Sequence, residues 1–203
     1  TKDQKVFKSI LLGKIDNTVG GISGGQFARY DKDDQAYLLK GALRMPSGKS
    51  DWFNSLLLKL DQDKLSSISV KRKKIIFEIE SKDKKLSLKN NPDLKIDEEK
   101  LKQVAEVIDA FYFYDVRKVN KIKNNNNNII SYKFKDGLIL ELKFIEKSKD
   151  SKESWIEISA QSNNPKTINE ANDLNKKTKG YQFLANINTS VIFNWNIKDL
   201  IKK

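Results

Sequence analysis

The sequence predicts an α+β fold with mainly antiparallel sheets and a few helices. Segments in which apolar and polar residues alternate recur along the chain and indicate strands, and turn signals separate several of them. Two other segments carry apolar residues at helical spacing behind a capping residue. Runs of strands interrupted by single helices are typical of antiparallel sheets packed on helices. From the length of 203 residues we expect two halves of related size that share an interface, residues 1–92 and 93–203.

The first half is predicted to be rich in strands and to contain one short helix. The helix is expected at residues 51–58, because Asp51 can lie near its start while Trp52 and Leu56 face inward. Pro92 closes this half. The expected strands are residues 5–15, 26–30, 36–40, 65–70, 75–80 and 86–88, with a glycine-rich turn at residues 16–25.

The second half is predicted to open with the clearest helix of the chain. Asp97 can cap this helix, and one apolar stripe runs along it, formed by Leu101, Val104, Ala105, Ile108 and Phe111. A second helix, residues 168–179, would begin with a capping box of Thr167 and Glu170 and stop at Gly180. The remaining expected elements are a loop at residues 124–128, strands at 155–160 and 181–184, and a short helix at 196–201.

A β-hairpin is predicted at residues 130–142. A two-residue loop, Asp136-Gly137, would place lysines opposite leucines. A three-residue loop over residues 135–137, with Gly137 in the left-handed conformation, instead pairs Tyr132 with Leu140 and Phe134 with Leu138. Because a slip of one residue would turn a whole apolar face to water, we predict the three-residue loop.

Histidine and cysteine are both absent from the chain, and this removes much of the chemistry open to an enzyme. Ser-His and Cys-His nucleophile pairs are excluded, and so are the usual zinc sites. Pairs of carboxylates, Glu78 with Glu80 and Glu141 with Glu157, alternate with inward apolar residues and are predicted to face solvent. We therefore expect no catalytic residues, no metal site and no cofactor.

Three short motifs resemble ligand-binding loops without completing them. Ser47-Gly48-Lys49-Ser50 ends like a Walker A motif, but Leu43 stands where its first glycine should be. The glycine-rich segment 20–25 is followed by a strand, whereas a phosphate loop needs a helix there. The acidic segment 31–34 begins like a calcium loop but lacks its turn glycine and final glutamate, so an acidic hairpin turn is the better interpretation.

The net charge of +12 makes nucleic acid the alternative partner. Only four of the 39 basic residues are arginines, although the planar guanidinium is the group that suits phosphate and base recognition. The densest basic cluster, residues 71–74, lies between two predicted strands and is expected to be a solvated turn. On this evidence nucleic-acid binding is the less favoured hypothesis.

Four consecutive aromatic residues form the candidate interaction surface of the chain: Phe111, Tyr112, Phe113 and Tyr114. Only some of them can face a core, whatever the local structure. A tyrosine at an interface contributes a large apolar ring and a hydroxyl group that can form hydrogen bonds. The interpretation favoured for this run is nevertheless a helix end packed onto the sheet.

A set of short segments along the chain forms one recognisable pattern. These segments are Leu11-Leu12-Gly13-Lys14, Phe27-Ala28-Arg29-Tyr30, Ala36-Tyr37-Leu38-Leu39, Asp51-Trp52-Phe53 with Leu56-Leu57, Asp63-Lys64-Leu65 through Ile68, Glu170-Ala171 through Leu174, Gly180-Tyr181-Gln182-Phe183 and Asp199-Leu200-Ile201. Taken together, they resemble a bacterial family known as domain of unknown function 4340. The resemblance spans nearly the whole chain, although residues 124–128 look like an insertion and Tyr181 stands where the family often has tryptophan.

The resemblance implies a location and a context rather than a reaction. Such proteins usually carry one N-terminal membrane helix followed by an extracytoplasmic domain, and they are often encoded near components of ABC-type transporters. We therefore expect a non-enzymatic accessory or interaction domain on the periplasmic side of the inner membrane. Its partners would be envelope or transporter proteins, and its membrane anchor would precede Thr1. The family carries no established catalytic or ligand residues to transfer.

Overall fold

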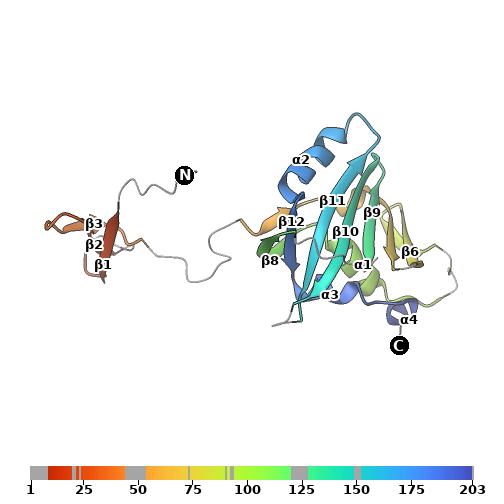
Figure 1. Cartoon of the computed structure of the whole chain (residues 1–203). Coiled ribbons are helices and arrows are strands. Elements are labelled where there is room, and N and C mark those ends of the chain that lie inside the picture. The colour runs from red at the N-terminus through yellow and green to blue at the C-terminus, as the bar shows by residue number, and fades with distance from the viewer. Residues whose placement is uncertain are drawn as a thin grey trace. The chain divides into compact units, whose positions relative to one another are not determined.

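The computed structural model describes residues 9–19, 22, 24–43, 54–72, 74–89, 91, 94–119, 128–148 and 152–202. The chain divides into two compact units, Thr1–Ser47 and Gly48–Lys203. Their described residues form a three-stranded sheet in the first unit and a nine-stranded sheet with helices in the second (Figure 1). All the described strand pairs are antiparallel, which confirms the α+β class. The expected boundary at residue 92 falls inside the second unit, where strands from both sides of it share one sheet.

The first unit is a meander of β1 (Ile10–Asp16), β2 (Gly25–Tyr30) and β3 (Tyr37–Lys40) in that spatial order. The strand predictions at 26–30 and 36–40 are confirmed within a residue. The predicted first strand is confirmed over β1, while its residues 5–8 lie outside the described part. Gln26 links the meander internally, since its Nε2 donates to the Gly13 carbonyl at 3.1 Å and its Oε1 accepts from the Leu43 amide at 2.9 Å.

The sheet of the second unit has the order β4-β8-β12-β11-β10-β9-β5-β6-β7 (Figure 1). The predicted hairpin is confirmed in its register, because Tyr132 pairs with Leu140 and Gly137 is left-handed with φ of 89°. The strands are β4 (Leu56–Leu58), β5 (Leu65–Lys71), β6 (Ile75–Lys82), β7 (Lys85–Leu88), β8 (Phe111–Lys118), β9 (Ile129–Phe134), β10 (Leu138–Lys147), β11 (Ser154–Ser162) and β12 (Tyr181–Ala185).

One face of this sheet builds the hydrophobic core together with the helices. Helix α1 (Glu98–Glu106) begins at the predicted cap, where the Asp97 side chain accepts from the Glu99 amide at 3.1 Å. It packs Leu101, Val104 and Ala105 onto the sheet, and the fully buried Tyr132 hydroxyl of β9 donates to the Val104 carbonyl at 2.9 Å. Two short helices, α3 (Ile187–Ile192) and α4 (Ile197–Leu200), add Ile192 and Leu200 to the same core.

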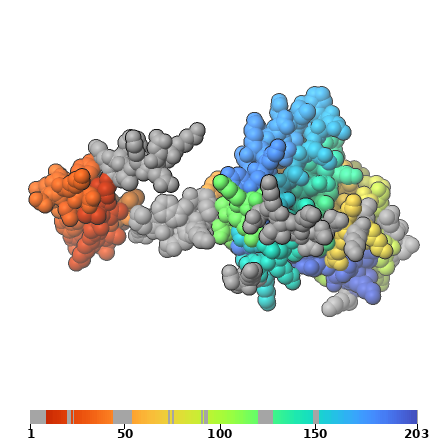
Figure 2. Space-filling model, viewed as in Figure 1, coloured from red at the N-terminus to blue at the C-terminus, as the bar shows by residue number. Residues whose placement is uncertain are grey.

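Helix α2 (Ile168–Thr178) closes an edge that the strands leave open. β12 pairs with β11 only over residues 154–156, so the rest of that side of β11 has no described strand beside it. Asn175 takes the place of a strand there, because its Oδ1 accepts from the Ala160 amide at 2.9 Å and its Nδ2 donates to the Ala160 carbonyl at 2.7 Å. The space-filling view shows the blue atoms of α2 lying against the lighter blue atoms of β11 (Figure 2).

Replacing Asn175 by alanine is expected to lower the free energy of unfolding by about 1–3 kcal/mol. Both backbone groups of Ala160 lose their partner, and an unsatisfied buried polar group carries a desolvation penalty of this size. Urea unfolding of the purified chain measures the effect. Asn172→Ala on the exposed side of the same helix is the control, and it should stay within about 0.5 kcal/mol of the parent. Equal effects of the two substitutions would show that the amide clamp does not stabilise the edge.

Two local predictions are wrong, and one short helix was not predicted. Residues 56–58 form β4 instead of a helix, because β4 pairs with β8, and residues 51–53 of that prediction lie outside the described part. The capping box at α2 does not form: the Thr167 hydroxyl contacts the Ser162 hydroxyl at 2.7 Å and donates to the Asp136 carbonyl at 3.3 Å. Helix α3 was not predicted, although Asn186 caps it by accepting from the Thr189 amide at 2.8 Å.

Candidate functional site

The four aromatic residues of the candidate interaction surface lie on β8, and their side chains alternate between the two faces of the sheet. Phe111 and Phe113 are 1% and 6% exposed and belong to the core, whereas Tyr112 and Tyr114 are 45% and 49% exposed. This alternation follows from the two-residue period of a strand. The favoured interpretation of a packed helix end is wrong, because α1 ends at Glu106 and the chain has become a strand by Phe111.

A β-bulge then changes which residues of β8 face outward. Phe113 pairs with Ala185 and Val116 pairs with Phe183, so three steps along β8 match two steps along β12. Because Phe183 and Ala185 both face the core, the bulge places Arg117 on the same outer face as Tyr112 and Tyr114. The bulge therefore gathers two tyrosines and an arginine on one side of a single strand.

Arg117 is the centre of a polar network that spans four neighbouring strands. Its Nε donates to Oε1 of Gln182 on β12 at 2.8 Å, and its Nη2 donates to Oε1 of Glu146 on β10 at 2.6 Å. The guanidinium lies over the ring of Trp155 on β11, 4.1 Å from the ring centre. Gln182 continues the network, since its Nε2 donates to Oε1 of Glu157 at 2.9 Å. Stacking and hydrogen bonds together hold the arginine in one orientation.

We call the residues Tyr112, Tyr114, Arg117, Trp155 and Leu184 the β8 surface. Leu184 belongs to it because it pairs with Trp155 on the outer face of the sheet. The sequence predicted only the two tyrosines of this set. Arg117, Trp155 and Leu184 come from three separate strands, and a motif search along the chain has no signal that joins them. Trp155 alone had a signal in the sequence, since it alternates with the core-facing residues of its strand and is half-buried in the structure.

The rest of the outer face carries carboxylates, lysines and serines in mixed order. The predicted solvent-facing position of Glu78, Glu80, Glu141 and Glu157 is confirmed, since all four alternate with core residues and are partly exposed. Glu78 and Glu80 contact Lys89 and Lys82 at 3.3 and 3.0 Å. In the described part of the chain, no three acidic side chains gather in a way that could hold a metal ion. This face offers charges of both signs rather than a basic track.

The arginine of the basic cluster at residues 71–74 forms hydrogen bonds within the fold. Arg72 donates to the carbonyls of Phe193 and Trp195 at 3.4 and 3.1 Å and to the Asn196 side chain at 3.1 Å. These bonds fasten the β5–β6 turn to the segment between α3 and α4. A guanidinium engaged in this way is not presented to a phosphate group, so the cluster gives no structural support to nucleic-acid binding.

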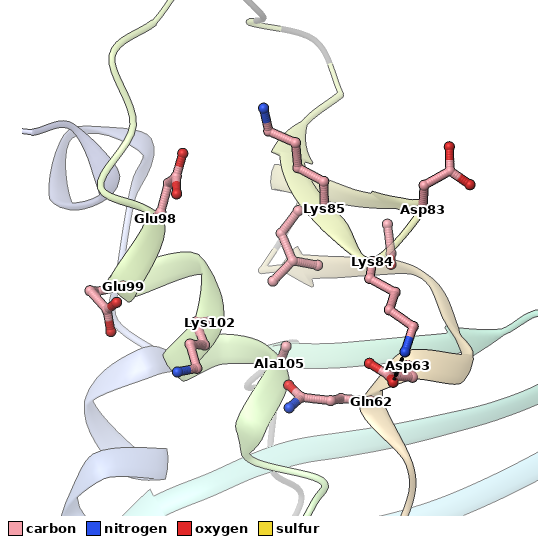
Figure 3. A pocket seen from close by; sticks show the side chains of 11 residues that line it. Gln62, Asp63, Asp83, Lys84, Lys85, Glu98, Glu99, Lys102 and Ala105 are labelled. Carbon is pink, nitrogen blue, oxygen red and sulfur yellow. Dashed lines mark hydrogen bonds and ion pairs between the residues drawn. The ribbon is translucent and has the colours of Figure 1, made fainter.

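A cleft beside α1 has a volume of about 500 Å³ and is lined by charges of both signs (Figure 3). It lies between α1, the β6–β7 turn and a 3₁₀ helix, Gln62–Lys64. Lys84 points toward Asp63 and contacts it at 2.5 Å, and this hydrogen bond raises the pKa of the lysine (Figure 3). Glu99 and Lys102 point away from the β6–β7 hairpin (Figure 3). Because its lining carries both positive and negative side chains, the cleft shows no preference for a ligand of either charge.

The other predicted motifs lie wholly or partly outside the described residues. The Walker-like segment 47–50 and residues 124–127 of the asparagine tract are outside, as are residues 20, 21 and 23 of the glycine-rich segment. The acidic segment 31–34 is a turn between β2 and β3, as predicted. Arg29 Nη1 supports it by donating to the Asp33 carbonyl at 2.7 Å.

Comparison with known proteins gives one result. The sequence model of the family described as "Domain of unknown function (DUF4340)" matches residues 3–128, which is more than half of the chain. The chain belongs to the DUF4340 family. The match includes the first unit and the strands from β4 through β8, so it covers Tyr112, Tyr114 and Arg117 but ends before Trp155 and Leu184. No curated protein and no solved structure matches the chain. Among the described residues, every helix is too short or too polar to cross a lipid bilayer.

Proposed function

We propose that this DUF4340 chain is a protein-interaction domain and that its protein partner binds the β8 surface. The observation that carries the proposal is the arrangement of Tyr112, Tyr114, Trp155 and Arg117 on one outer face. Tyrosine, tryptophan and arginine are the residues that dominate the binding energy of protein interfaces. Two tyrosines about half exposed, beside a stacked arginine, provide apolar area and hydrogen-bond donors together.

The network around Arg117 supports the same function through its rigidity. The arginine is already oriented by Trp155, Gln182 and Glu146, so a partner would lose little conformational entropy in fixing it. The neighbouring carboxylates argue for protein over nucleic acid, because Glu146 and Glu157 would repel a phosphate backbone brought onto this face. A protein partner with basic and polar groups can pair with those carboxylates.

The proposed setting is the extracytoplasmic side of the membrane, with an ABC-type transporter component as the partner. The resemblance described above supports this setting, as DUF4340 proteins are often encoded beside such components. Protease added to intact spheroplasts should degrade the native full-length protein. Degradation that occurs only after the cells are lysed would place the protein inside and refute the location.

Photocrosslinking in the native cell tests the partner. A photoreactive phenylalanine analogue at position 114 should give one ultraviolet-dependent adduct, identified by mass spectrometry as an envelope protein. Tyr181 is the matched control, a tyrosine 41% exposed on the neighbouring strand that shares the core side with Phe183. The same adduct at both positions, or none at position 114, would contradict the proposal. An adduct removed by nuclease would instead support the nucleic-acid hypothesis.

A further inference from the structure

The first unit has almost no core of its own. Among its described residues Ala28 is the one buried apolar side chain, at 6% exposure. Large apolar side chains are exposed on both faces of the meander, and more than half of all such side chains in the described part of the chain belong to this unit. A three-stranded sheet needs an apolar face packed on something to be stable. An exposed apolar patch of this kind marks an interaction site.

The strand register defines which residues share one face. Tyr30 pairs with Ile10, and Ala28 pairs with both Leu12 and Tyr37, so their side chains lie together, with Leu39 two residues beyond Tyr37. None of these side chains is charged. The opposite face carries Leu11, Phe27 and Leu38 beside Arg29 and Lys40. The two faces therefore differ in charge, although both are apolar.

The uncharged face is hollowed over Ala28. The Ala28 hollow has a volume of about 270 Å³ and is lined by Ile10, Ala28, Arg29, Tyr30, Tyr37 and Leu39. Ala28, the two tyrosines and the two aliphatic residues line it together with part of Arg29, whose guanidinium donates to the Asp33 carbonyl. Because most of its lining is apolar, the hollow is suited to an apolar side chain of a larger partner.

An acidic turn borders the hollow. The turn at residues 31–34 connects Tyr30 at the end of β2 to the segment that leads into Tyr37, and it carries three aspartates and one lysine. Asp31 and Asp34 are exposed. Arg29 Nη1 donates to the Asp33 carbonyl and so supports the backbone of the turn. A lysine or arginine of a partner would meet complementary charge at this end.

The size of the face decides between a peptide segment and a second copy of this chain. Three strands about 4.8 Å apart and some five residues long present a face of only a few hundred Å². A stable dimer needs about 800 Å² from each partner. One extended segment covers such a face without further contacts.

We propose that the Ala28 hollow and the turn 31–34 together bind a short apolar segment of a protein partner that carries a lysine or arginine beside its apolar residues. An aliphatic side chain of the segment occupies the hollow between Tyr30 and Tyr37, and the basic residue lies against Asp31 and Asp34. This surface belongs to the first unit and is distinct from the β8 surface, so the chain has two separate places to hold proteins.

Fluorescence anisotropy with the full chain tests the proposal. The probe is a labelled peptide with the core Lys-Leu-Val-Leu-Lys, compared with a peptide whose lysines are glutamates and one whose leucines are serines. Both altered peptides should bind about ten-fold more weakly, since 1.4 kcal/mol corresponds to that factor. Failure of the lysine peptide to bind, or equal binding of the lysine and glutamate peptides, would overturn the proposal.

Matched variants locate the binding. Leu39→Ser should weaken the lysine peptide about ten-fold, whereas Leu38→Ser, an equally exposed neighbour on the opposite face, should leave it within about two-fold. The double variant Asp31→Asn with Asp34→Asn should weaken binding of the lysine peptide but not of the glutamate peptide. Equal losses from Leu38→Ser and Leu39→Ser would refute the hollow as the site. Both leucines are exposed, so circular dichroism should show an intact fold for either variant.

Two other occupants give different results. If a second copy covers the face, sedimentation will show a dimer that Leu39→Ser dissociates and that competes with the peptide. If a lipid surface covers it, vesicles of phosphatidylethanolamine and phosphatidylglycerol will bind the parent chain but not Leu39→Ser. Either result overturns the proposal. Because none of these measurements involves Tyr112 or Tyr114, they leave the function proposed for the β8 surface to its own test.

Discussion

Replacing Tyr132 by alanine is expected to lower the free energy of unfolding by about 3–5 kcal/mol, as for other large aromatic residues removed from a core. Tyr132 is fully buried at the centre of the nine-stranded sheet, beneath α1. Its hydroxyl also serves the end of that helix, because the Val104 carbonyl is one of the last four in α1 and such carbonyls lack helical partners. The substitution removes the packing and the hydrogen bond together.

Urea unfolding of Tyr132→Ala and Tyr132→Phe separates the two contributions. The phenylalanine variant keeps the ring and loses only the hydrogen bond, so it should lose about 1–3 kcal/mol. Tyr112→Phe removes an exposed hydroxyl from a nearby strand and should change stability by less than about 0.5 kcal/mol. A loss in Tyr132→Phe no larger than in Tyr112→Phe would show that the bond to Val104 contributes nothing.

The same residue makes stability depend on alkaline pH. Burial raises the pKa of Tyr132 well above its ordinary value of 10.0, so the folded state keeps the proton that the unfolded state begins to lose near pH 10. This contribution is fully present below pH 10 and is lost as the pH rises further toward the folded value. Unfolding free energies measured between pH 8 and 11 should fall more steeply for the parent than for Tyr132→Phe, which has no group to ionise there.

Neighbouring substitutions on β8 should differ by several kcal/mol. Phe113→Ala is expected to cost about 3–5 kcal/mol, because its ring is buried and meets the Phe183 ring edge-on with centres 5.1 Å apart. Tyr114→Ala, one residue later on the outer face, should cost less than about 0.5 kcal/mol. Thermal or urea unfolding of both variants checks the pair. A large loss from Tyr114→Ala would mean that this side chain serves the fold and is not held available for a partner.

Local signals in the sequence predicted the elements that depend on neighbouring residues. Gly137 favours a left-handed turn, and this preference, together with the alternating apolar residues on either side, is enough to define the hairpin register. The Asp97 side chain caps the N-terminus of α1, where an aspartate stabilises a helix most. Gly180, with φ of 87°, follows the end of α2 as predicted. These features depend on a few adjacent residues, so a single sequence is enough to find them.

Two of the strands that were missed depend on distant partners. Phe111 fits the apolar stripe of α1 at helical spacing and also fits the alternation of a strand, and only its pairing with Leu58 of β4, far earlier in the chain, decides for the strand. β4 is a strand for the same reason, since it pairs with β8. The candidate site shows the same limit: the tyrosines were found from their cluster, while Arg117 reached the outer face through a bulge that only pairing with β12 creates.

The place of β12 in the sheet has a consequence for how the chain folds. β12 is the last described strand in the sequence, yet it lies inside the sheet between β8 and β11. The sheet therefore remains in two pieces until residue 185 is available to join them. Contacts of such long sequence separation slow folding, because the chain loses the entropy of loop closure before the stabilising contacts form. In a nascent chain of this protein, β8 and β11 therefore lack the strand that lies between them until residue 185 has been synthesised.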